Sequence, residues 1–511
     1  MNKTIVFAGD APSSTLLDRE RRGELRRLAT GVYTTDVTAV PADVVRREWH
    51  TIVGHLYAGA VITDRSGVTG GPVDGYLYLA HSARSRETEL PGLIVIARPG
   101  AGPLEGDIPL PGGLYQASKG RTLVENTRPS RARNGRPRRT LDADELADWI
   151  DRLAMVDDDD KLAAYRIAAE RTAQPLGAAD DAIATVSRLI GAALGTQQAD
   201  SGSSALAARQ AGLPYDRDRM RLFGVLIDAL HASRPQNRPV ADPSAARYTH
   251  LPFYEAYFSN FIEGTEFDLP DALAVVYEGK SLPGRDDDSH DLLGTYQVVN
   301  DRTEMSMVAA TPEDFVQLMR SRHATILAGR PALRPGEFKE AANRAGESLF
   351  VLPAYVPGTL RAGFERLAEL DTAFERAVYM MFLGSEVHPF NDGNGRIARV
   401  MMNAELVAGG QSRIIVPTVY RDDYLGALRR LSRQDDASVL IKALRFAQDY
   451  TSMVPFVTTG GAETVLRATN AFYDSDSADR LVLPDTARRP VASEHSFPPF
   501  EPPPPGHGIG L

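Results

Sequence analysis

The sequence contains no cysteine among its 511 residues. This absence excludes disulfide bonds, thiolate catalysis and zinc sites built from cysteine. Long apolar runs are also missing, so the sequence predicts neither a signal peptide nor a membrane span. Acidic residues outnumber basic ones and give a formal net charge of -10, which argues against a chain that binds nucleic acid over its whole surface. We therefore expect a soluble cytoplasmic protein.

The length exceeds what one ordinary hydrophobic core supports, so the sequence predicts several domains. Short β-branched runs come first, a long region with helical periodicity follows, and the end is rich in proline. We expect a mainly α protein preceded by a small α/β or α+β domain. The predicted divisions are an N-terminal domain at 1–155, a helical connector at 156–240, a catalytic domain at 241–475 and a disordered tail at 476–511.

The stretch HPFNDGNGRIAR, residues 388–399, lies between two helical patterns. Apolar spacing predicts one buried helix face before it and another after it, and Pro389 prevents the first helix from running on. Polar and turn-forming residues are what a core avoids, whereas they suit phosphate binding. The glycine-rich loop lets backbone amides approach a ligand and leads into a helix N-terminus, so it predicts an anion site.

Single side chains within the motif extend this interpretation. Arg396 and Arg399 lie three apart at the start of the second predicted helix, which indicates a clamp for a polyphosphate. Asp392 supplies a hard oxygen that suits Mg2+ bridging two phosphates. His388, with an ordinary pKa near neutrality, is then available to take a proton from an incoming hydroxyl. Each residue type alone is commonplace, and the fixed spacing of all of them favours an active site.

The motif resembles the signature of Fic-domain proteins, and the resemblance extends over roughly residues 245–450. It implies an all-helical Fic fold with a short β-hairpin flap, and an enzyme that uses Mg2+ to transfer AMP from ATP to a protein hydroxyl. It also implies His388 as the general base and Asp392 as the metal ligand. The matching positions are His388, Phe390, Asp392, Gly393, Asn394, Gly395, Arg396 and Arg399. The implied nucleotide-binding residues are Asn391, Gly393, Asn394, Gly395, Arg396 and Arg399.

A second motif precedes the first, in the stretch FYEAYFSNFIEGTEF. Ser259 and Glu263 are four apart and share a helix face, and Gly264 is a natural helix stop. This spacing resembles the inhibitory motif of Fic proteins whose inhibitory helix lies N-terminal in the same chain. The resemblance implies that Glu263 pairs with Arg399 and excludes the productive pose of the γ-phosphate. It leaves removal of AMP open, because in some members the same glutamate positions water.

The strand-like segment Ser348–Pro353 stands where the family has its flap, a hairpin that offers an edge to an extended target. The implied target is a Ser, Thr or Tyr hydroxyl of a protein, including this enzyme itself.

Residues 21–36, RRGELRRLATGVYTTD, are similar to the winged-helix start of antitoxin-like regulators. The rival hypothesis is therefore a DNA-binding regulator or toxin–antitoxin fusion, with DNA contact through residues 1–155 and a nucleotide-sensing Fic part. A third hypothesis is transfer of another nucleotide or of phosphate. The sequence indicates no oligomeric state.

Overall fold

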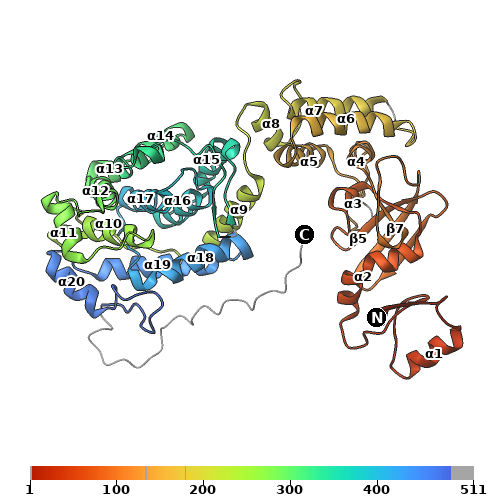
Figure 1. Cartoon of the computed structure of the whole chain (residues 1–511), viewed down its shortest axis with the longest axis horizontal. Coiled ribbons are helices and arrows are strands. Elements are labelled where there is room, and N and C mark those ends of the chain that lie inside the picture. Colours follow the sequence, from red (N-terminus) through yellow and green to blue (C-terminus); the bar gives the residue numbers. More distant parts are fainter. Residues whose placement is uncertain (1–2, 133–134, 179, 347, 485–511) are drawn as a thin grey trace. The chain divides into compact units, whose positions relative to one another are not determined.

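The structure, a computed structural model, describes residues 3–132, 135–178, 180–346 and 348–484. These residues form two compact units that divide between Gly212 and Leu213 (Figure 1). The fold is mainly helical with a small sheet region in its first part, which confirms the predicted fold class. None of the helices in the described ranges is long and apolar enough to cross a membrane. The four predicted domain ranges stay predictions, and residues 485–511 of the predicted tail lie outside the described residues.

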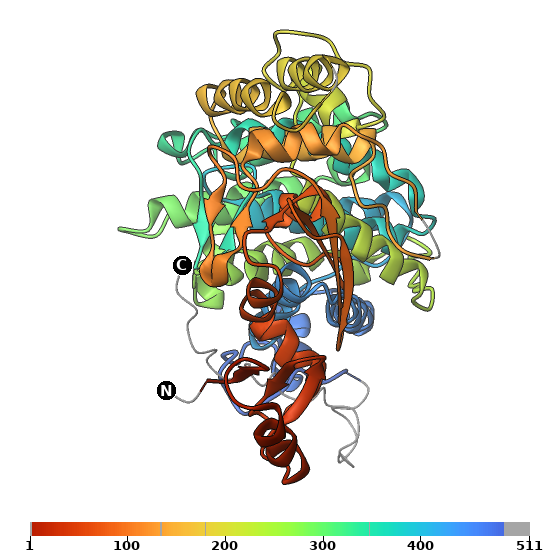
Figure 2. The same ribbon diagram turned by 90° about the vertical axis from the view of Figure 1, so that its right-hand side faces the viewer.

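The first unit contains two sheets, drawn as red to orange arrows in Figure 2. A small antiparallel sheet has the order β1-β3-β2, and a mixed sheet has the order β6-β7-β5-β4-β9-β8. Strands β5 and β7 run parallel, with Tyr76 opposite Ile94 and His81 opposite Pro99. The strands are β1 Ile5–Phe7, β2 Arg26–Ala29, β3 Val32–Thr34, β4 Val61–Ile62, β5 Tyr76–His81, β6 Arg86–Leu90, β7 Leu93–Pro99, β8 Ile108–Pro109 and β9 Tyr115–Gln116.

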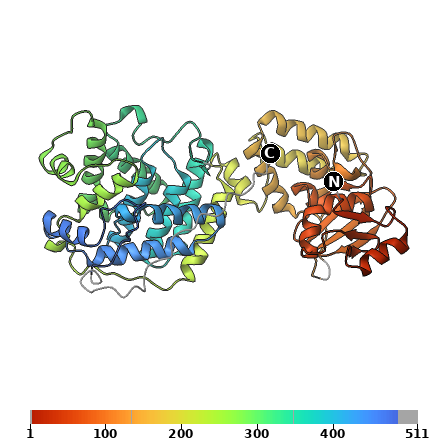
Figure 3. The ribbon, with the colours of Figure 1, turned by 60° about the horizontal axis from the view of Figure 1, so that its bottom comes forward.

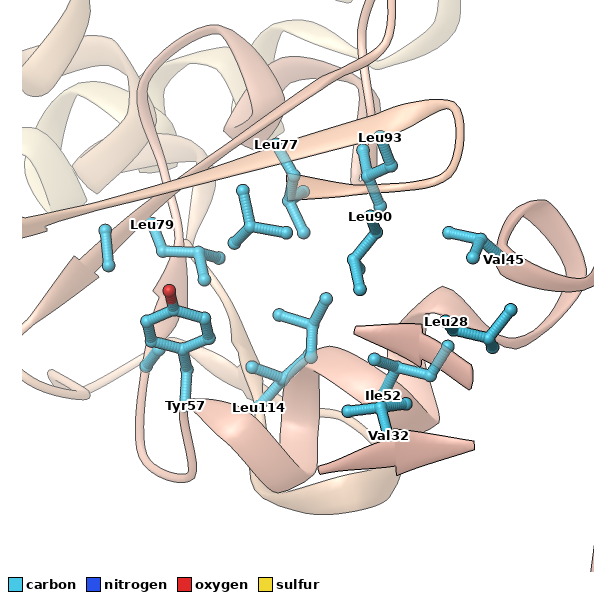
Figure 4. Packing of buried hydrophobic residues seen from close by; sticks show 14 of the residues in the cluster. Leu28, Val32, Val45, Ile52, Tyr57, Leu77, Leu79, Leu90, Leu93 and Leu114 are labelled. Atoms are coloured by element: carbon cyan, nitrogen blue, oxygen red, sulfur yellow. The ribbon is translucent and has the colours of Figure 1, made fainter. Parts of the chain in front are cut away.

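Helix α2 covers the core of this unit. Its residues Val45 and Ile52 pack with Leu77, Leu79 and Leu93 of the mixed sheet (Figure 4). The alternation of buried side chains along β7 is typical of a strand with one face on a core. The helices of the unit are α1 Ser13–Arg21, α2 Pro41–Leu56, α3 Asp64–Thr69, α4 Lys119–Asn126, α5 Ala143–Val156, α6 Asp159–Ala173, α7 Asp180–Ala193 and α8 Ser204–Gln210.

A group of charged side chains lies next to this core, with its carboxylates buried and two of its arginines partly exposed, and we call it the N-terminal ion cluster. Its members are Asp64, Arg98, Asp107, Arg121, Glu125 and Arg139. Arg98 binds the carboxylate of Asp64 with two nitrogens, at 2.9 and 3.1 Å. Burial raises the pKa of Glu125 although two arginines lie beside it. Because each carboxylate lies against an arginine, the cluster holds α3, β7 and α4 together.

The second unit is built from helices around α16 and α17, which pack closely against each other (Figures 1 and 3). A Cβ atom on Gly384 would lie only 3.1 Å from Cβ of Ala398, so the glycine permits this approach. Helix α16 begins with a capping box, in which Thr372 and Glu375 each satisfy the backbone N–H of the other. The helices are α9 Arg217–His231, α10 Leu251–Ile262, α11 Leu269–Glu278, α12 Asp286–Asn300, α13 Arg302–Ser306, α14 Pro312–Ile326, α15 Val356–Glu365, α16 Ala373–Val387, α17 Asn394–Ala408, α18 Arg421–Gln434, α19 Ser438–Met453 and α20 Thr459–Ala468.

A hairpin of two short strands interrupts these helices. It consists of β10 Arg344–Ala345 and β11 Ser348–Leu349, paired antiparallel. The predicted strand-like segment Ser348–Pro353 therefore contains one strand of this hairpin. Short 3-10 turns complete the two units: η1 Pro111–Gly113, η2 Ala246–Tyr248, η3 Pro331–Leu333, η4 Pro353–Tyr355, η5 Arg366–Glu369 and η6 Thr418–Tyr420.

Candidate active site

The turn after α16 places His388 at the end of that helix. His388 has a φ of 52°, in the left-handed region that a residue with a side chain rarely adopts. Two upstream side chains hold the turn, because Lys339 Nζ donates to the His388 carbonyl at 2.8 Å and Asn343 Nδ2 donates to the Phe390 carbonyl at 3.0 Å. The backbone at the histidine is thus fixed from outside the motif.

The ring of His388 is oriented and uncharged at neutral pH. Its Nδ1 lies 3.3 Å from the carbonyl oxygen of Ser385, and since a carbonyl only accepts, Nδ1 carries the proton and Nε2 keeps a lone pair. Phe350 stacks on the ring with centroids 3.7 Å apart and planes at 5°. Burial lowers the pKa of His388 to about 4, and the nearby cation of Lys339 acts in the same direction. The histidine can therefore accept a proton at Nε2.

Asn394 closes the loop that follows His388. Its Oδ1 accepts the N–H of Phe390 at 2.8 Å, and its Nδ2 donates to the Phe390 carbonyl at 2.9 Å. Helix α17 begins directly after Gly393, which has a φ of 73° and carries no side chain that could cap the first turn. Within the part of the chain that the structure describes, no side chain caps the first-turn amides, including that of Gly395, as an anion site at a helix N-terminus requires. Both polar atoms of the Asn394 side chain bind the backbone of Phe390, so the backbone N–H of Asn394 is the group that remains for the predicted phosphate contact.

Asp392 is the candidate metal ligand. One oxygen accepts the N–H of Gly393 at 2.7 Å, the other lies 3.4 Å from Nη2 of Arg396, and the side chain is 45% exposed. Across the described ranges, no three metal-binding side chains gather into a site of their own. Magnesium bound with a nucleotide commonly takes one or two carboxylates and completes its shell with phosphates and water. The single exposed carboxylate fits that donor set.

Arg396 turns toward α10 and α12. Its Nη1 donates to the carboxylate of Asp291 and lies 3.3 Å from Oδ1 of Asn260. Arg330 binds the same Asp291 carboxylate at 2.9 Å. Burial raises the pKa of Asp291, and the two arginines oppose that shift. Two buried polar atoms, Nε of Arg396 and Oδ1 of Asp291, find no hydrogen-bond partner among the described residues.

Arg399, one turn later, binds the end of α10. Its Nε donates to Oγ of Ser259 at 3.0 Å, and its Nη2 donates to the Ser259 carbonyl at 2.8 Å and to Oε1 of Glu263 at 2.7 Å. Burial alone would lower the pKa of Arg399, but the Glu263 carboxylate and the Tyr424 hydroxyl together outweigh it and raise the pKa. Helix α10 ends at Ile262, and Gly264 has a φ of 90°, the left-handed value typical of a residue after a helix.

Gly395 makes room for this ion pair. A Cβ atom at residue 395 would lie 2.1 Å from Oε1 of Glu263 and 3.0 Å from Nη1 of Arg399. The carboxylate therefore occupies the space directly against the first turn of α17. An anion held at that helix end by the backbone amides would meet Glu263 there.

A cavity of about 680 Å³ brings the key groups together. Glu263, His388, Gly395 and Arg399 all line it, together with the hairpin residues Ser348, Leu349 and Phe350 and one face of α18. The other predicted site residues, Asn391, Asp392, Asn394 and Arg396, lie next to it on the loop and on α17 but outside its lining. Asn391 is exposed, and its Nδ2 lies 3.4 Å from the carbonyl of Leu333.

Several supporting residues were not predicted from the sequence. His323 stacks on Phe390 at 3.7 Å and donates from Nε2 to the Asp392 carbonyl at 2.9 Å. Burial lowers the pKa of His323 to about 4, so it too is uncharged at neutral pH. Lys339 and Asn343 lie in the irregular segment before the hairpin, where no periodicity marks them. Nothing local marks His323 or Asp291, because each meets the motif from a distant part of the sequence.

The comparison with known families decides the identity of this region. The sequence model of the Fic/DOC family matches residues 312–406, from the start of α14 to near the end of α17. Residues 312–406 are a Fic domain. This domain contains the whole motif at 388–399, and the predicted Fic resemblance is confirmed. The inhibitory motif at 259–264 lies outside the matched range.

Relatives of the Fic domain carry names that concern AMP transfer. Over 253 residues the chain is 26% identical to a protein of Nematostella vectensis named protein adenylyltransferase Fic, which covers 46% of this chain and 56% of that protein. The Drosophila melanogaster protein of the same name is 27% identical over 274 residues, covering 49% of this chain and 51% of that protein. The chain thus matches about half the length of these relatives.

Among solved structures, similar chains also carry Fic names. Fic-1 (residues 134–508) from C. elegans is 18% identical, with a TM-score of 0.35, and the match covers 60% of this chain and 89% of that one. A Fic domain containing signaling protein from Bacteroides thetaiotaomicron is 15% identical, with a TM-score of 0.37, covering 48% of this chain and 97% of that one.

Proposed function

We propose that this chain is a protein adenylyltransferase that transfers AMP from ATP to a Ser, Thr or Tyr hydroxyl of a protein, including itself. One observation carries the proposal: a single cavity is lined by the uncharged His388, by the uncapped start of α17 and by Arg399. A base and a polyphosphate site in one cavity are what such a transfer needs. The names of the relatives of the Fic domain support the same reaction.

The transfer step follows from the orientation of His388. Its Nε2 takes the proton of the acceptor hydroxyl as that oxygen forms a bond to the α-phosphorus of ATP. The bond between the α-phosphorus and the oxygen that bridges to the β-phosphate breaks, and pyrophosphate leaves with the electron pair. The Ser385 carbonyl holds the Nδ1 proton throughout, which keeps the ring in the tautomer that can accept.

The loop and α17 are the proposed nucleotide site. Backbone amides of Gly393, Asn394 and Gly395 bind the α-phosphate, with Asn391 at the loop edge, and Arg396 and Arg399 hold the outer phosphates. Asp392 is the residue that would hold Mg2+, and the ion would neutralise charge on the phosphates. Nη2 of Arg396 lies 3.4 Å from a carboxylate oxygen of Asp392, so the proposed metal ligand and one of the proposed phosphate-binding arginines are adjacent.

We propose that Glu263 inhibits this reaction in the resting chain. Its carboxylate binds Arg399 at 2.7 Å and lies against Gly395 at the first turn of α17. It would therefore compete with a phosphate for the same arginine. Ser259 adds a second contact to Arg399 and steadies the end of α10. With the γ-phosphate displaced, the α-phosphorus is not presented in line to the acceptor. A change in pair energy of about 1.4 kcal/mol shifts such a competition about tenfold.

Intact mass after incubation with ATP and Mg2+ tests the proposal. We expect Glu263→Gly to gain the mass of one or more AMP groups, and wild type to gain fewer. Glu266→Gly is the matched control, because Glu266 is an exposed glutamate three residues later that is not part of the Arg399 pair. Parallel reactions with α-labelled and γ-labelled ATP separate AMP transfer from phosphate transfer. A gain of phosphate mass, or no gain in a folded Glu263→Gly chain that binds ATP, would contradict the proposal.

A further inference from the structure

The hairpin beside His388 has one edge that faces away from its own partner strand. Phe350 stacks on His388, so β11 lies next to the proposed base. The N–H of Phe350 donates to the Asn343 carbonyl at 3.3 Å, and Leu349 lies opposite Arg344. Hydrogen-bonded and non-hydrogen-bonded pairs alternate along antiparallel strands. The backbone groups of Leu349 therefore point away from β10, and we call this side of β11 the outer edge.

An arginine already covers the outer edge. Nη2 of Arg219, on α9, donates to the Leu349 carbonyl at 2.5 Å, and Nη1 of the same side chain binds Glu386 at 2.8 Å. The guanidinium takes the position that the N–H of an added strand would occupy. A segment that pairs with the outer edge must therefore replace Arg219 at this carbonyl.

Two further arginines stand on α18 beside the same edge. Arg429 and Arg433 are four apart, so they share a helix face, and both line the cavity that contains His388 and Leu349. Nη2 of Arg433 donates to Oγ of Ser348 at 3.0 Å. Both side chains belong to exposed residues, and within the described ranges neither forms an ion pair with a carboxylate.

Other arginines of α18 differ from these two. Arg430 pairs with Asp436 at 2.8 Å, and Arg421 lies 3.3 Å from Asp422. Two exposed cations without counter-ions among the described residues, beside the strand edge that Arg219 covers, form a surface that attracts negative charge. The phosphates of ATP are provided for elsewhere, at the start of α17 and at Arg399, so they do not account for Arg429 and Arg433.

We infer that the protein substrate is an extended segment with acidic side chains next to its acceptor hydroxyl. The segment pairs through its main chain with Leu349 on the outer edge of β11, where it replaces Arg219. Its carboxylates are bound by Arg429 and Arg433. This inference rests on the proposed adenylyltransferase function and specifies the substrate class of that same cavity.

Two synthetic peptides of equal length test the inference. Both have a central acceptor, supplied as an equimolar mixture of Ser, Thr and Tyr forms, and they differ in having glutamate or glutamine on both sides of it. Each is incubated with Glu263→Gly enzyme and α-labelled ATP, and kcat/KM is measured. We expect the acidic peptide to be preferred about fivefold or more, through a lower KM, since two ion pairs of the surface kind contribute.

Charge reversal on α18 supplies the specificity control. In the Glu263→Gly background, the double change Arg429→Glu and Arg433→Glu should abolish or invert the preference and leave the KM for ATP within about twofold. Arg430→Glu is the matched control on the same helix, outside the cavity lining, and should keep the preference. Rising salt should weaken the preference, because exposed charges are screened.

Labelling of the enzyme itself is measured in the same reaction as labelling of the peptides, and it separates failure of this inference from failure of the proposed function. An enzyme that labels itself but treats both peptides alike, or labels neither, overturns the acidic substrate and leaves AMP transfer standing. A preference that survives the double charge reversal also overturns it. Absence of all labelling, of enzyme and of peptide, overturns both.

Discussion

Both units of this protein bury arginines against carboxylates, but the two arrangements differ in what they leave open. In the N-terminal ion cluster, Asp64 is fully buried and lies between two arginines, Arg98 and Arg139. In the second unit, Glu263 binds the buried Arg399 while its own side chain is 28% exposed to the active-site cavity. A carboxylate enclosed on all sides can only stabilise the fold. A carboxylate at a cavity wall can be exchanged for a ligand, which is the basis of the regulatory role that we propose for Glu263.

The largest effect should come from His388, the proposed proton acceptor of the cavity. The N-terminal ion cluster contains no histidine. In the Glu263→Gly background, His388→Ala should lower labelling about 10²- to 10⁴-fold, because proton transfer to a placed base contributes that much. ATP binding, measured by calorimetry, should stay within about twofold, since the histidine is not assigned to the phosphates. Labelling at the rate of the Glu263→Gly parent by a variant that binds ATP normally would refute the base assignment.

Next in size is the effect of neutralising Asp64. Asp64→Asn keeps the shape and tolerates the φ of 54°, but it removes the counter-ion that Arg98 and Arg139 share. Because Arg98 keeps Glu125 and both arginines are partly exposed, the first unit should lose about 1.5–3 kcal/mol of unfolding free energy. Both tryptophans, Trp49 and Trp149, belong to the first unit, so their fluorescence during denaturation reports this unit.

The control for Asp64 is an exposed ion pair in the same unit. Asp43→Asn removes a surface partner of Arg46 and should hardly move the fluorescence midpoint. Labelling by the second unit should be unchanged in both variants. If Asp64→Asn were as stable as Asp43→Asn, the buried cluster would not have the stabilising role assigned to it.

Removing Glu263 should have a smaller effect and the opposite sign. Glu263→Gly should raise labelling from α-labelled ATP several-fold, because Arg399 becomes available to the γ-phosphate. Its thermal midpoint should change little, since the side chain is partly exposed. A variant that is folded, binds ATP and labels no more than Glu266→Gly would show that the ion pair does not regulate.

Ser259→Ala tests the weaker contact with the same arginine. The change removes the hydroxyl that accepts from Nε of Arg399 but leaves the Glu263 pair and the Ser259 carbonyl contact in place. Loss of about 0.5 kcal/mol, the low end for a net hydrogen bond, predicts about a twofold rise in labelling. A rise equal to that of Glu263→Gly would mean that the serine, and not the carboxylate, holds the resting state.

The smallest expected effect is that of pH on the base. With a pKa of about 4, His388 is mostly neutral at pH 5 as well as at pH 7, so kcat/KM of Glu263→Gly should change less than about twofold between them. Activity should fall only as pH drops through about 4, where the ring takes up a proton. ATP binding measured at each pH separates protonation of the nucleotide from that of the base. A fall of more than tenfold by pH 5 with unchanged ATP binding would show an ordinary histidine pKa.

The sequence allowed prediction of the motif residues and the mainly helical fold because their signals are local. The spacing from His388 to Arg399 and the glycine before α17 are read from one short stretch of chain. Partners that meet the motif across the fold were not predictable in this way, as Asp291 reaches Arg396 from 105 positions away and Lys339 reaches the His388 carbonyl from 49 positions away. The uncharged state of His388 also depends on burial, which no local pattern encodes.

The close approach at Gly395 limits how this chain can vary. A methyl group there would collide with the Glu263 carboxylate in the resting chain, and it would also crowd the amides proposed to bind a phosphate. One missing side chain is thus required by both the idle and the working conformation. An alanine scan would report a single defect at this position although two states are damaged. A lineage that kept only one of the two states would still need glycine at this position.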